Sequence, residues 1–396
     1  MADNVKAIKK KDVKPGMYIR GYGKGSFLDP QVEVGRFIES FEDIEKYLPD
    51  DTEQVEILTD KFLDLPGKKE VKSKRTADTA ARDLAEALPA ARKVHDEAMC
   101  YVKKMISDIR TGKSIEVAAA ESIVDQIIEN VSVNKSALLT LSFLKNYDEY
   151  TYTHCINVNL YSVLLGKDIG LDRATLQQLG IAALFHDVGK GRISNKVLNK
   201  PGKLTDDEYE IMKTHSLLGL KVLSSVKGMR KEVLRGVVEH HERFNGTGYP
   251  RSLEGEGIHP FGRMIAISDV YDALTSVRVY KKAMTASKTL SLMYKWKGTD
   301  FDPAYFNRFV MIMGIYPPGT FVQLEDKRFA LVLETNDDAP QKPKVKVLFD
   351  KKMRPVRSEC IDLNSYGMEG QGMKVLCQTD PSELGIDMKR LAGFLT

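Results

Sequence analysis

Histidine and aspartate side chains gather in the middle of this 396-residue chain. Five of its seven histidines lie between residues 150 and 245, whereas His95 and His259 lack comparable neighbours. A lone histidine on a helix is more often a hydrogen-bonded core or surface residue than a metal ligand, so only their joint placement is informative. The candidate ligands are His154, His186, Asp187, His215, His240, His241 and Asp269. Such a nitrogen and oxygen set suits iron, manganese or zinc, which make bound water nucleophilic at neutral pH.

The pair His186-Asp187 closes a predicted helix whose apolar face includes Leu176, Leu179 and Leu184. An imidazole and a carboxylate at a helix end can reach one metal ion or two neighbouring ones. We expect the glycine at 189 to let the chain leave the helix. The next residue, Lys190, then lies close enough to neutralise phosphate charge or to protonate a leaving oxygen.

A second adjacent pair, His240-His241, ends another predicted helix and precedes the turn 245–250. Adjacent helical residues project about 100° apart, so such a pair can serve two metals or one metal and its water. Taken alone, the pair favours a polar helix end.

Asp269 and Asp272 are three residues apart in the apolar helical segment 263–276, and therefore share one face. A buried carboxylate needs a partner. A metal ion is one solution, and an ion pair with Arg278 or Lys281 is the other.

Apolar residues at intervals of three and four predict that most of these side chains lie on helices, beginning near residue 78. Pro89 should end or kink the first helix. The segment Thr205 to Glu208 has the form of a capping box. Further helices are predicted over 115–145, 153–168, 173–188, 206–226, 229–243 and 262–277.

Short apolar runs flank this helical region and predict strands. At the N-terminus, runs at 17–19 and 55–58 are separated by glycine-rich turn material at 21–25. At the C-terminus, three runs predict a small antiparallel appendage. We therefore expect a mainly α protein with four regions: a small α+β N-terminal domain (1–65), a linker and helical connector (66–144), a central all-helical domain (145–314) and a short β-rich C-terminal extension (315–396).

The bulk composition excludes several classes of protein. With 59 basic and 55 acidic residues, the charge is too even for a general binder of duplex nucleic acid. The four cysteines form no CxxC pair, which indicates neither a zinc ribbon nor a disulfide framework and suits a reducing cytoplasm. No stretch approaches the roughly 18 apolar residues of a membrane span.

The order and spacing of several motifs resemble the HD-GYP signature over about residues 145 to 300. The matching residues are the HDxGK string 186–190, His215, His240-His241, Gly248-Tyr249-Pro250, Asp269 and the following YDALTSxRxYK run. The resemblance implies a helical HD-type domain of a bacterial phosphodiesterase that hydrolyses cyclic di-GMP or, in some members, cyclic GMP-AMP. Residues 12–19 and 55–58 look like the uncharacterised domain that often precedes HD-GYP in proteobacteria.

The resemblance also implies roles for single residues. All seven candidates become metal ligands, with Asp187 bridging, and Lys190 would lie beside the scissile phosphate. The positions that contact nucleotide or phosphate would be Tyr249, Asp272, Arg278 and Lys281. Members with a third metal carry a glutamate where this chain has Tyr150, with Glu149 one residue off, so we expect two divalent metals, iron or alternatively manganese.

The working hypothesis is metal-dependent hydrolysis of a cyclic dinucleotide to the linear dinucleotide, with mononucleotide as a further product. One alternative is a signalling module that binds a cyclic dinucleotide or a partner protein without cleaving it. A general HD phosphohydrolase is another, but it leaves Gly248-Tyr249-Pro250 without a role. A homodimer or a signalling-protein partner is also considered.

Overall fold

The computed structural model divides the chain into two units, Met1–Arg75 and Thr76–Thr396. Each unit is described by itself. The described residues are 5–13, 17–23, 33–38, 44, 46, 48, 52, 54–62, 76–143, 150–276, 283–336, 339–365, 372–386 and 391.

The first unit contains a four-stranded antiparallel sheet in the order β1-β4-β2-β3. Its strands are β1 (Val5–Lys9), β2 (Met17–Gly23), β3 (Glu33–Phe37) and β4 (Gln54–Phe62). The expectation of a turn beginning at Gly21 is wrong, because β2 continues to Gly23. The pairing register shifts between Ile19 and Gly21, so the glycine marks an irregularity inside the strand.

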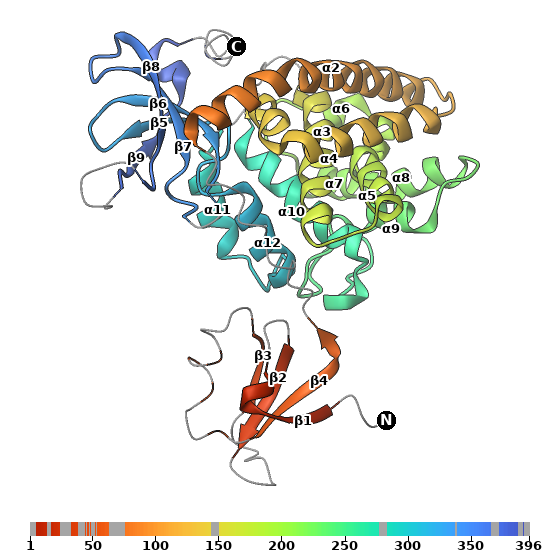
Figure 1. Cartoon of the computed structure of the whole chain (residues 1–396). Helices are drawn as coiled ribbons and strands as arrows, with labels where there is room; N and C mark the ends of the chain where they lie inside the picture. The colour runs from red at the N-terminus through yellow and green to blue at the C-terminus, as the bar shows by residue number, and fades with distance from the viewer. Residues whose placement is uncertain are drawn as a thin grey trace. The chain divides into compact units, whose positions relative to one another are not determined.

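The second unit is built around helix α4 (Tyr150–Asp168), most of whose described side chains are buried. Figure 1 shows the neighbouring helices gathered around it. Those that pack against α4 are α2 (Ala77–Arg110), α3 (Val117–Phe143), α5 (Arg173–Phe185), α10 (Pro260–Thr275) and α12 (Pro303–Met313). Helix α9 (Lys231–Glu239) packs against α5 and α10, and α11 (Ala286–Tyr294) packs against α10. The central all-helical domain is therefore confirmed, with α11 and α12 in addition to the helices predicted.

Pro89 lies inside α2, so the expectation that it could end the helix is wrong. The helix runs on to Arg110 and buries one stripe that includes Leu84, Leu88, Ala91 and Val94. Pro89 lies on the exposed side, where water can satisfy the carbonyl that loses its intrahelical donor. Burial of the opposite stripe stabilises the helix on both sides of the proline.

The single helix predicted over 206–226 consists of two helices, α7 (Asp206–Lys213) and α8 (His215–Ser224). The capping box at the start of α7 is confirmed, because Thr205 Oγ1 accepts from the Glu208 amide and the Glu208 carboxylate accepts from the Thr205 amide. The break at Thr214 places His215 at the first position of α8.

The C-terminal region forms a five-stranded antiparallel sheet in the order β8-β7-β6-β5-β9. The three predicted strands are present as β5 (Phe321–Leu324), β6 (Phe329–Glu334) and β7 (Lys344–Phe349), and two edge strands were not predicted: β8 (Pro355–Asp362) and β9 (Val375–Gln378).

Both faces of the central strands are buried, which explains why their sequences are continuously apolar. On β6, Phe329, Leu331 and Leu333 join the core of the helices, whereas Ala330 and Val332 face a smaller core of the sheet's own. The sheet is therefore part of the second unit's core.

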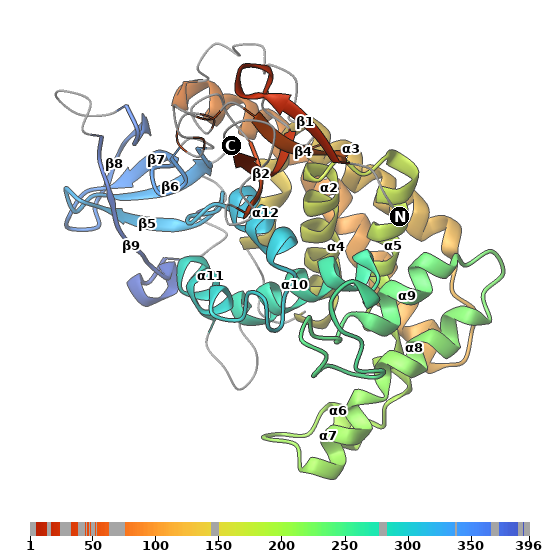
Figure 2. The ribbon, with the colours of Figure 1, turned by 90° about the horizontal axis from the view of Figure 1, so that it is seen from below.

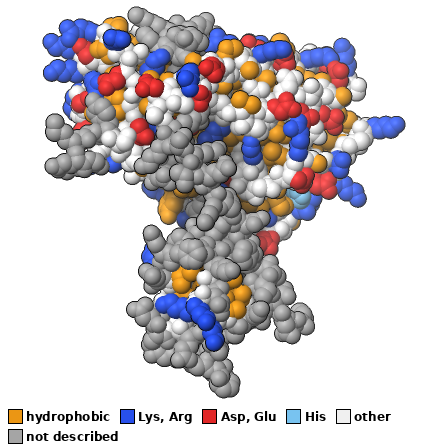
Figure 3. Space-filling model, viewed as in Figure 1, with side chains coloured by type: hydrophobic (Ala, Val, Ile, Leu, Met, Phe, Trp, Pro, Cys, Tyr) orange, Lys and Arg blue, Asp and Glu red, His pale blue; other side chains and the backbone are white. Residues whose placement is uncertain are grey.

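Charged side chains of both signs are interspersed over the face of the second unit that Figure 3 shows. This distribution agrees with the even balance of basic and acidic residues. Among the described helices, none combines the length and the apolar character that crossing a bilayer requires.

Candidate metal centre and its pocket

Seven histidine and aspartate side chains from separate helices converge in the second unit. They come from α4 (His154), the end of α5 (His186, Asp187), the start of α8 (His215), the end of α9 (His240, His241) and α10 (Asp269). The ligand atoms form two groups, each within 4.8 Å: Asp187, His215, His240 and His241, and His154, His186 and Asp269. The structure thus brings together every metal ligand predicted from the sequence.

Three of the histidines are oriented by the same kind of hydrogen bond to the backbone. The Nδ1 atoms of His186, His215 and His240 lie 2.7–2.8 Å from the carbonyl oxygen three residues earlier in the chain. Carbonyls in the last turn of a helix lack an intrahelical partner, so a histidine placed there can satisfy one of them. A carbonyl only accepts, so Nδ1 carries the proton and Nε2 is left with a free lone pair.

The Nε2 atoms of the histidines lie close together across the centre. The Nε2 atoms of His154 and His186 are 3.3 Å apart, and those of His215 and His240 are 3.4 Å apart. Two acceptors at this distance repel each other unless a cation or a proton lies between them. The arrangement therefore fits a pair of bound cations.

Asp187 lies between the two groups. Its Oδ2 is 3.3 Å from His186 Nε2 and 3.7 Å from His154 Nε2, whereas its Oδ1 is 3.4 Å from His215 Nε2. Oδ1 is buried and has no hydrogen-bond partner. An orphaned, buried carboxylate oxygen is costly in a protein interior, and a metal ion is the ligand that this donor set would bind.

The electrostatics of the centre favour the protonation states that metal binding requires. Burial lowers the pKa of His241 to about 3 and that of His240 well below its usual range. Burial alone would raise the pKa of Asp187, but the Lys190 ammonium and His186 lower it well below its usual value. Neutral imidazoles and an ionised carboxylate are the forms that bind metal ions.

His154 differs because it lies between carboxylates. Its Nε2 is 3.1 Å from Asp269 Oδ1 and its Nδ1 is 2.8 Å from Asp272 Oδ2. Burial lowers the pKa of His154, but hydrogen bonds to the two aspartates outweigh this effect and raise the pKa to about 9. In the absence of metal, His154 would therefore hold a proton that metal binding displaces.

Asp272 was expected to contact nucleotide, but the structure places it behind His154. The side chain is 0% exposed and also accepts from Asn157 Nδ2 at 2.8 Å and from Ser276 Oγ at 3.1 Å. Spacing correctly put Asp269 and Asp272 on one helix face, but Asp272 lies deeper. Its carboxylate contacts His154 Nδ1, the position from which a carboxylate often orients a metal-binding histidine.

Close packing of the turn after Asp187 brings the two groups together. A Cβ added to Gly189 would lie 1.9 Å from the His215 carbonyl oxygen, so only glycine fits against α8 here. Gly189 lies within a 3-10 helix, η3 (Val188–Arg192), and is not one of the residues with positive φ. Its expected role in leaving the helix is thus corrected to one of close approach.

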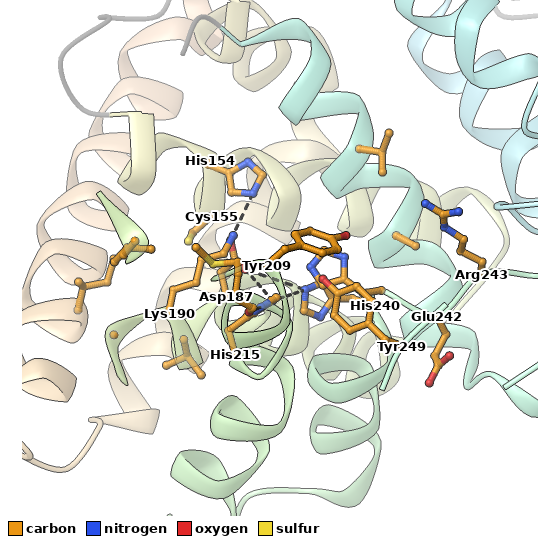
Figure 4. A pocket seen from close by; sticks show the side chains of 18 of the residues that line it. His154, Cys155, Asp187, Lys190, Tyr209, His215, His240, Glu242, Arg243 and Tyr249 are labelled. Atoms are coloured by element: carbon orange, nitrogen blue, oxygen red, sulfur yellow. Dashed lines mark hydrogen bonds and ion pairs between the residues drawn. The ribbon is translucent and has the colours of Figure 1, made fainter. Parts of the chain in front are cut away.

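The metal centre lies on the wall of a pocket of about 570 Å³. This size falls in the usual range for small-molecule sites. Figure 4 shows Lys190, Tyr209 and Tyr249 at this pocket beside several of the candidate ligands. Lys190 Nζ donates to Asp187 Oδ2, and the ring of Tyr249 stacks on His241 with centroids 4.8 Å apart. Lys190 and Tyr249 both line this pocket, and their contacts with phosphate and nucleotide stay predictions.

Two predicted phosphate contacts, Arg278 and Lys281, lie outside the described residues, as does Glu149. Tyr150 is the first residue of α4.

Sequence reasoning missed the residue that supports the Tyr249 loop. The Glu242 carboxylate is buried and accepts from the backbone amides of Arg251 at 2.7 Å and Leu253 at 3.1 Å. Gly248 packs against the same stretch, since a Cβ there would lie 2.4 Å from Glu242 Cα. Sequence reasoning also missed Asn157, although its i+3 spacing from His154 places both on one helix face.

The fold and the site together define an all-helical HD-type domain with a histidine and aspartate cluster that could hold metal ions. The HD domain model matches residues 138–305, the domain of unknown function DUF3391 matches residues 5–120, and the KOW domain associated with HD domains matches residues 321–366.

Three relatives show how much of the chain is similar to known proteins. A cyclic di-GMP phosphodiesterase of Pseudomonas aeruginosa is 35% identical over 381 residues, which cover 92% of this chain and 90% of the relative. A cyclic di-GMP phosphodiesterase of Vibrio cholerae is 37% identical over 44% of this chain and 39% of its own length. The 3'3'-cGAMP-specific phosphodiesterase 3 of the same organism is 34% identical over 42% of this chain and 36% of its own length. The chain belongs to the HD-GYP family of bacterial cyclic dinucleotide phosphodiesterases, with a DUF3391 domain at its N-terminus.

Proposed function

We propose that this chain is a metal-dependent phosphodiesterase that opens the ring of a cyclic dinucleotide, either cyclic di-GMP or 3'3'-cyclic GMP-AMP. The observation that carries the proposal is the position of Asp187, whose two oxygens face two separate groups of imidazoles and one of which has no hydrogen-bond partner. The similarity to cyclic di-GMP and cyclic GMP-AMP phosphodiesterases supports the substrate class.

Two divalent metal ions, iron or alternatively manganese, would be held by the seven side chains, with Asp187 bridging. The mixed imidazole and carboxylate set suits these metals. When bound, the ions supply Lewis-acid activation of water and neutralise charge on the scissile phosphate.

The chain's own residues then bind and orient the substrate. Lys190 lies beside Asp187 at the pocket, where its ammonium can protonate the departing ribose 3'-oxygen. Tyr249, held by its stack on His241, offers an aromatic surface to a base. Arg278 and Lys281 stay predicted phosphate contacts, and they would orient the phosphodiester for in-line attack.

The deciding experiment combines metal analysis with turnover. Protein purified without oxygen should contain two metal ions per chain and should hydrolyse at least one of the two cyclic dinucleotides offered in competition. Asp187→Asn should lower both metal content and turnover, the latter by about 100-fold or more. His95→Ala, which changes a histidine outside both ligand groups, should behave as wild type.

Two outcomes would contradict the proposal. One is full hydrolysis by Asp187→Asn. The other is wild-type protein that binds a cyclic dinucleotide and never cleaves it, which would establish the non-catalytic signalling module instead.

We also place the protein in the cytoplasm, because all four cysteines are free thiols and a reducing compartment keeps them so. A homodimer or a signalling-protein partner stays a prediction.

A further inference from the structure

Residues of helix α7 line the pocket, although none of its side chains is part of the hydrophobic core. None of its residues is buried. Figure 2 shows α6 (Asn195–Leu198) and α7 projecting from the rest of the helices. Local contacts account for its folding, namely the capping box and an ion pair between Lys200 and Glu208. Yet Tyr209 and Met212 of this helix line the pocket beside the metal centre.

Tyr209 is part of a cluster of two aromatic rings and one cation. The Lys213 ammonium lies 5.5 Å from the centre of the Tyr209 ring and 5.8 Å from the centre of the Tyr249 ring. Tyr249 stacks on His241 in turn. Figure 4 shows Tyr209 and Tyr249 on the same side of the pocket as His240. Cation and π contacts at these distances hold the two rings near each other and near the metal ligands.

The backbone couples this cluster to the centre. Only Thr214 separates Lys213 from His215, whose imidazole belongs to the first ligand group. The orientation of α7 is therefore set by the same turn that presents a metal ligand. Tyr209 remains half exposed, at 50%, so part of its ring is open to a ligand in the pocket.

A tyrosine with a lysine one turn away is common on exposed helices, and this chain has a second example. Tyr294 on α11 is 58% exposed and has the Lys297 ammonium 4.4 Å from its ring centre. That pair does not line the pocket. Tyr209 differs because its ring lines the pocket and its lysine is shared with Tyr249.

We propose that Tyr209 is a nucleobase-binding residue, whose exposed ring face stacks on one base of the cyclic dinucleotide while the phosphodiester lies at the metal centre. This inference rests on the proposed function. Every base has a π-face, so an aromatic ring beside a phosphate site is suited to receive one. The Lys213 ammonium pairs with Glu210 and lies within cation–π distance of both tyrosine rings, which suits a positioning role.

The test compares wild type with Tyr209→Ala, Tyr209→Phe and the matched control Tyr294→Ala in the metal-loaded full chain. Binding is measured with a phosphorothioate analogue of cyclic di-GMP, and kcat and KM are measured with cyclic di-GMP. Tyr209→Ala should raise both Kd and KM by about 10-fold or more, because a stacked base is lost. Its metal content should be unchanged, and its kcat should stay within about threefold of wild type. Tyr209→Phe keeps the ring face and should resemble wild type, as should Tyr294→Ala.

A second readout separates the base from the phosphate. Inhibition by GMP should weaken in Tyr209→Ala, whereas inhibition by ribose 5-phosphate, which has no base, should stay as in wild type. Unchanged analogue binding in Tyr209→Ala overturns the inference, and so does an equal loss in Tyr209→Phe, which would assign the effect to the hydroxyl.

The same measurements distinguish failure of the proposed hydrolysis from failure of the role proposed for Tyr209. Wild type that binds the analogue without hydrolysing cyclic di-GMP contradicts the proposed hydrolysis, while the Kd series still decides the role of Tyr209. Wild type that neither binds nor hydrolyses a cyclic dinucleotide overturns both.

Discussion

The Asp187 carboxylate connects the two halves of the metal centre. Its Oδ2 lies 3.3 Å from His186 Nε2 and 3.7 Å from His154 Nε2. Its Oδ1 lies 3.4 Å from His215 Nε2 and 4.0 Å from His240 Nε2. Asp269 makes a similar connection, because its two oxygens face His154 and His241. Two carboxylates facing both groups would offset half of the charge of two divalent cations, whereas neutral imidazoles would offset none.

Asp272 acts on the centre through His154, and this role is testable. Asp272→Asn replaces a charged acceptor of the His154 Nδ1 proton by an amide, so the ring is held less firmly and is a weaker ligand. We expect metal affinity to fall by about 10- to 100-fold, measured by metal titration. Asp302→Asn, at another buried aspartate that pairs with Arg263 and caps α12, should leave metal affinity unchanged. Equal affinity in Asp272→Asn and wild type would contradict this role.

The identity of the ligands was predictable, whereas the depth of each side chain was not. Residue type and spacing marked His186-Asp187, His240-His241 and Asp269 as candidates, and the resemblance to the HD-GYP signature implied that they are ligands. Asp272 satisfies the same spacing rule, but a single sequence does not show that His154 would lie in front of it. Tyr209 gave no signal, because an exposed tyrosine on a polar helix is ordinary until the pocket beside it is known.

At the scale of elements, helix ends position the ligands of the site. His186, His215 and His240 all lie where a helix begins or ends, and the Nδ1 of each contacts the backbone carbonyl three residues earlier. The ligands are thus held by backbone geometry before any metal binds, which reduces the conformational entropy lost on binding.

The turn that contains Gly189 packs tightly against the start of α8. In Gly189→Ala the new methyl would lie 1.9 Å from the His215 carbonyl oxygen, so η3 and α8 must separate. We expect unfolding stability to fall by about 1–3 kcal/mol. Metal affinity should fall as well, because Asp187 and His215 are drawn apart.

The matched control is Gly257→Ala, where nothing lies within 4 Å of the added Cβ and φ is not positive. Denaturant unfolding and metal titration of both variants check the expectation. Gly189→Ala with wild-type stability and metal content would show that the turn does not need this contact.

The long helices were predictable from their periodic apolar residues. The observed helix boundaries differ from the predicted ones at a few places, each with a local feature of its own. The predicted range 173–188 ends at Phe185, and His186 is the C-cap, with both its backbone N–H and its Nδ1 directed at the Ala183 carbonyl. The range 206–226 divides at Thr214, where helical φ and ψ persist, so periodicity alone does not reveal the break. The helices α11 and α12 are short, but Thr285, and Asp302 followed by Pro303, are start signals that could have been used.

At the scale of the whole molecule, the C-terminal sheet belongs to the helical core, and the N-terminal sheet has a core of its own. Phe321, Phe329 and Phe349 are buried in the same cluster as the helices. The core of the first unit includes Ile19, Ile38 and Val55. Apolar runs predicted the strands, but a sequence does not state which surface they cover.

Two truncations test this division. Removing residues 315–396 would expose the apolar surface of α2 and α3 that now contacts β6, β7 and β8, so we expect a lower midpoint of thermal unfolding or aggregation. Removing residues 1–75 takes away a unit with its own core and should leave the midpoint of the second unit and its metal content unchanged. A protein cut after residue 314 that unfolds at the wild-type midpoint would contradict a shared core.

We propose that seven side chains hold two metal ions, with Asp187 between the two ligand groups. Anomalous diffraction from crystals of the metal-loaded protein, recorded at the absorption edge of the bound metal, tests it most directly. We expect two peaks about 3.5–4 Å apart, with the Asp187 carboxylate contacting both. A single peak, or two peaks of which only one contacts Asp187, would contradict the account.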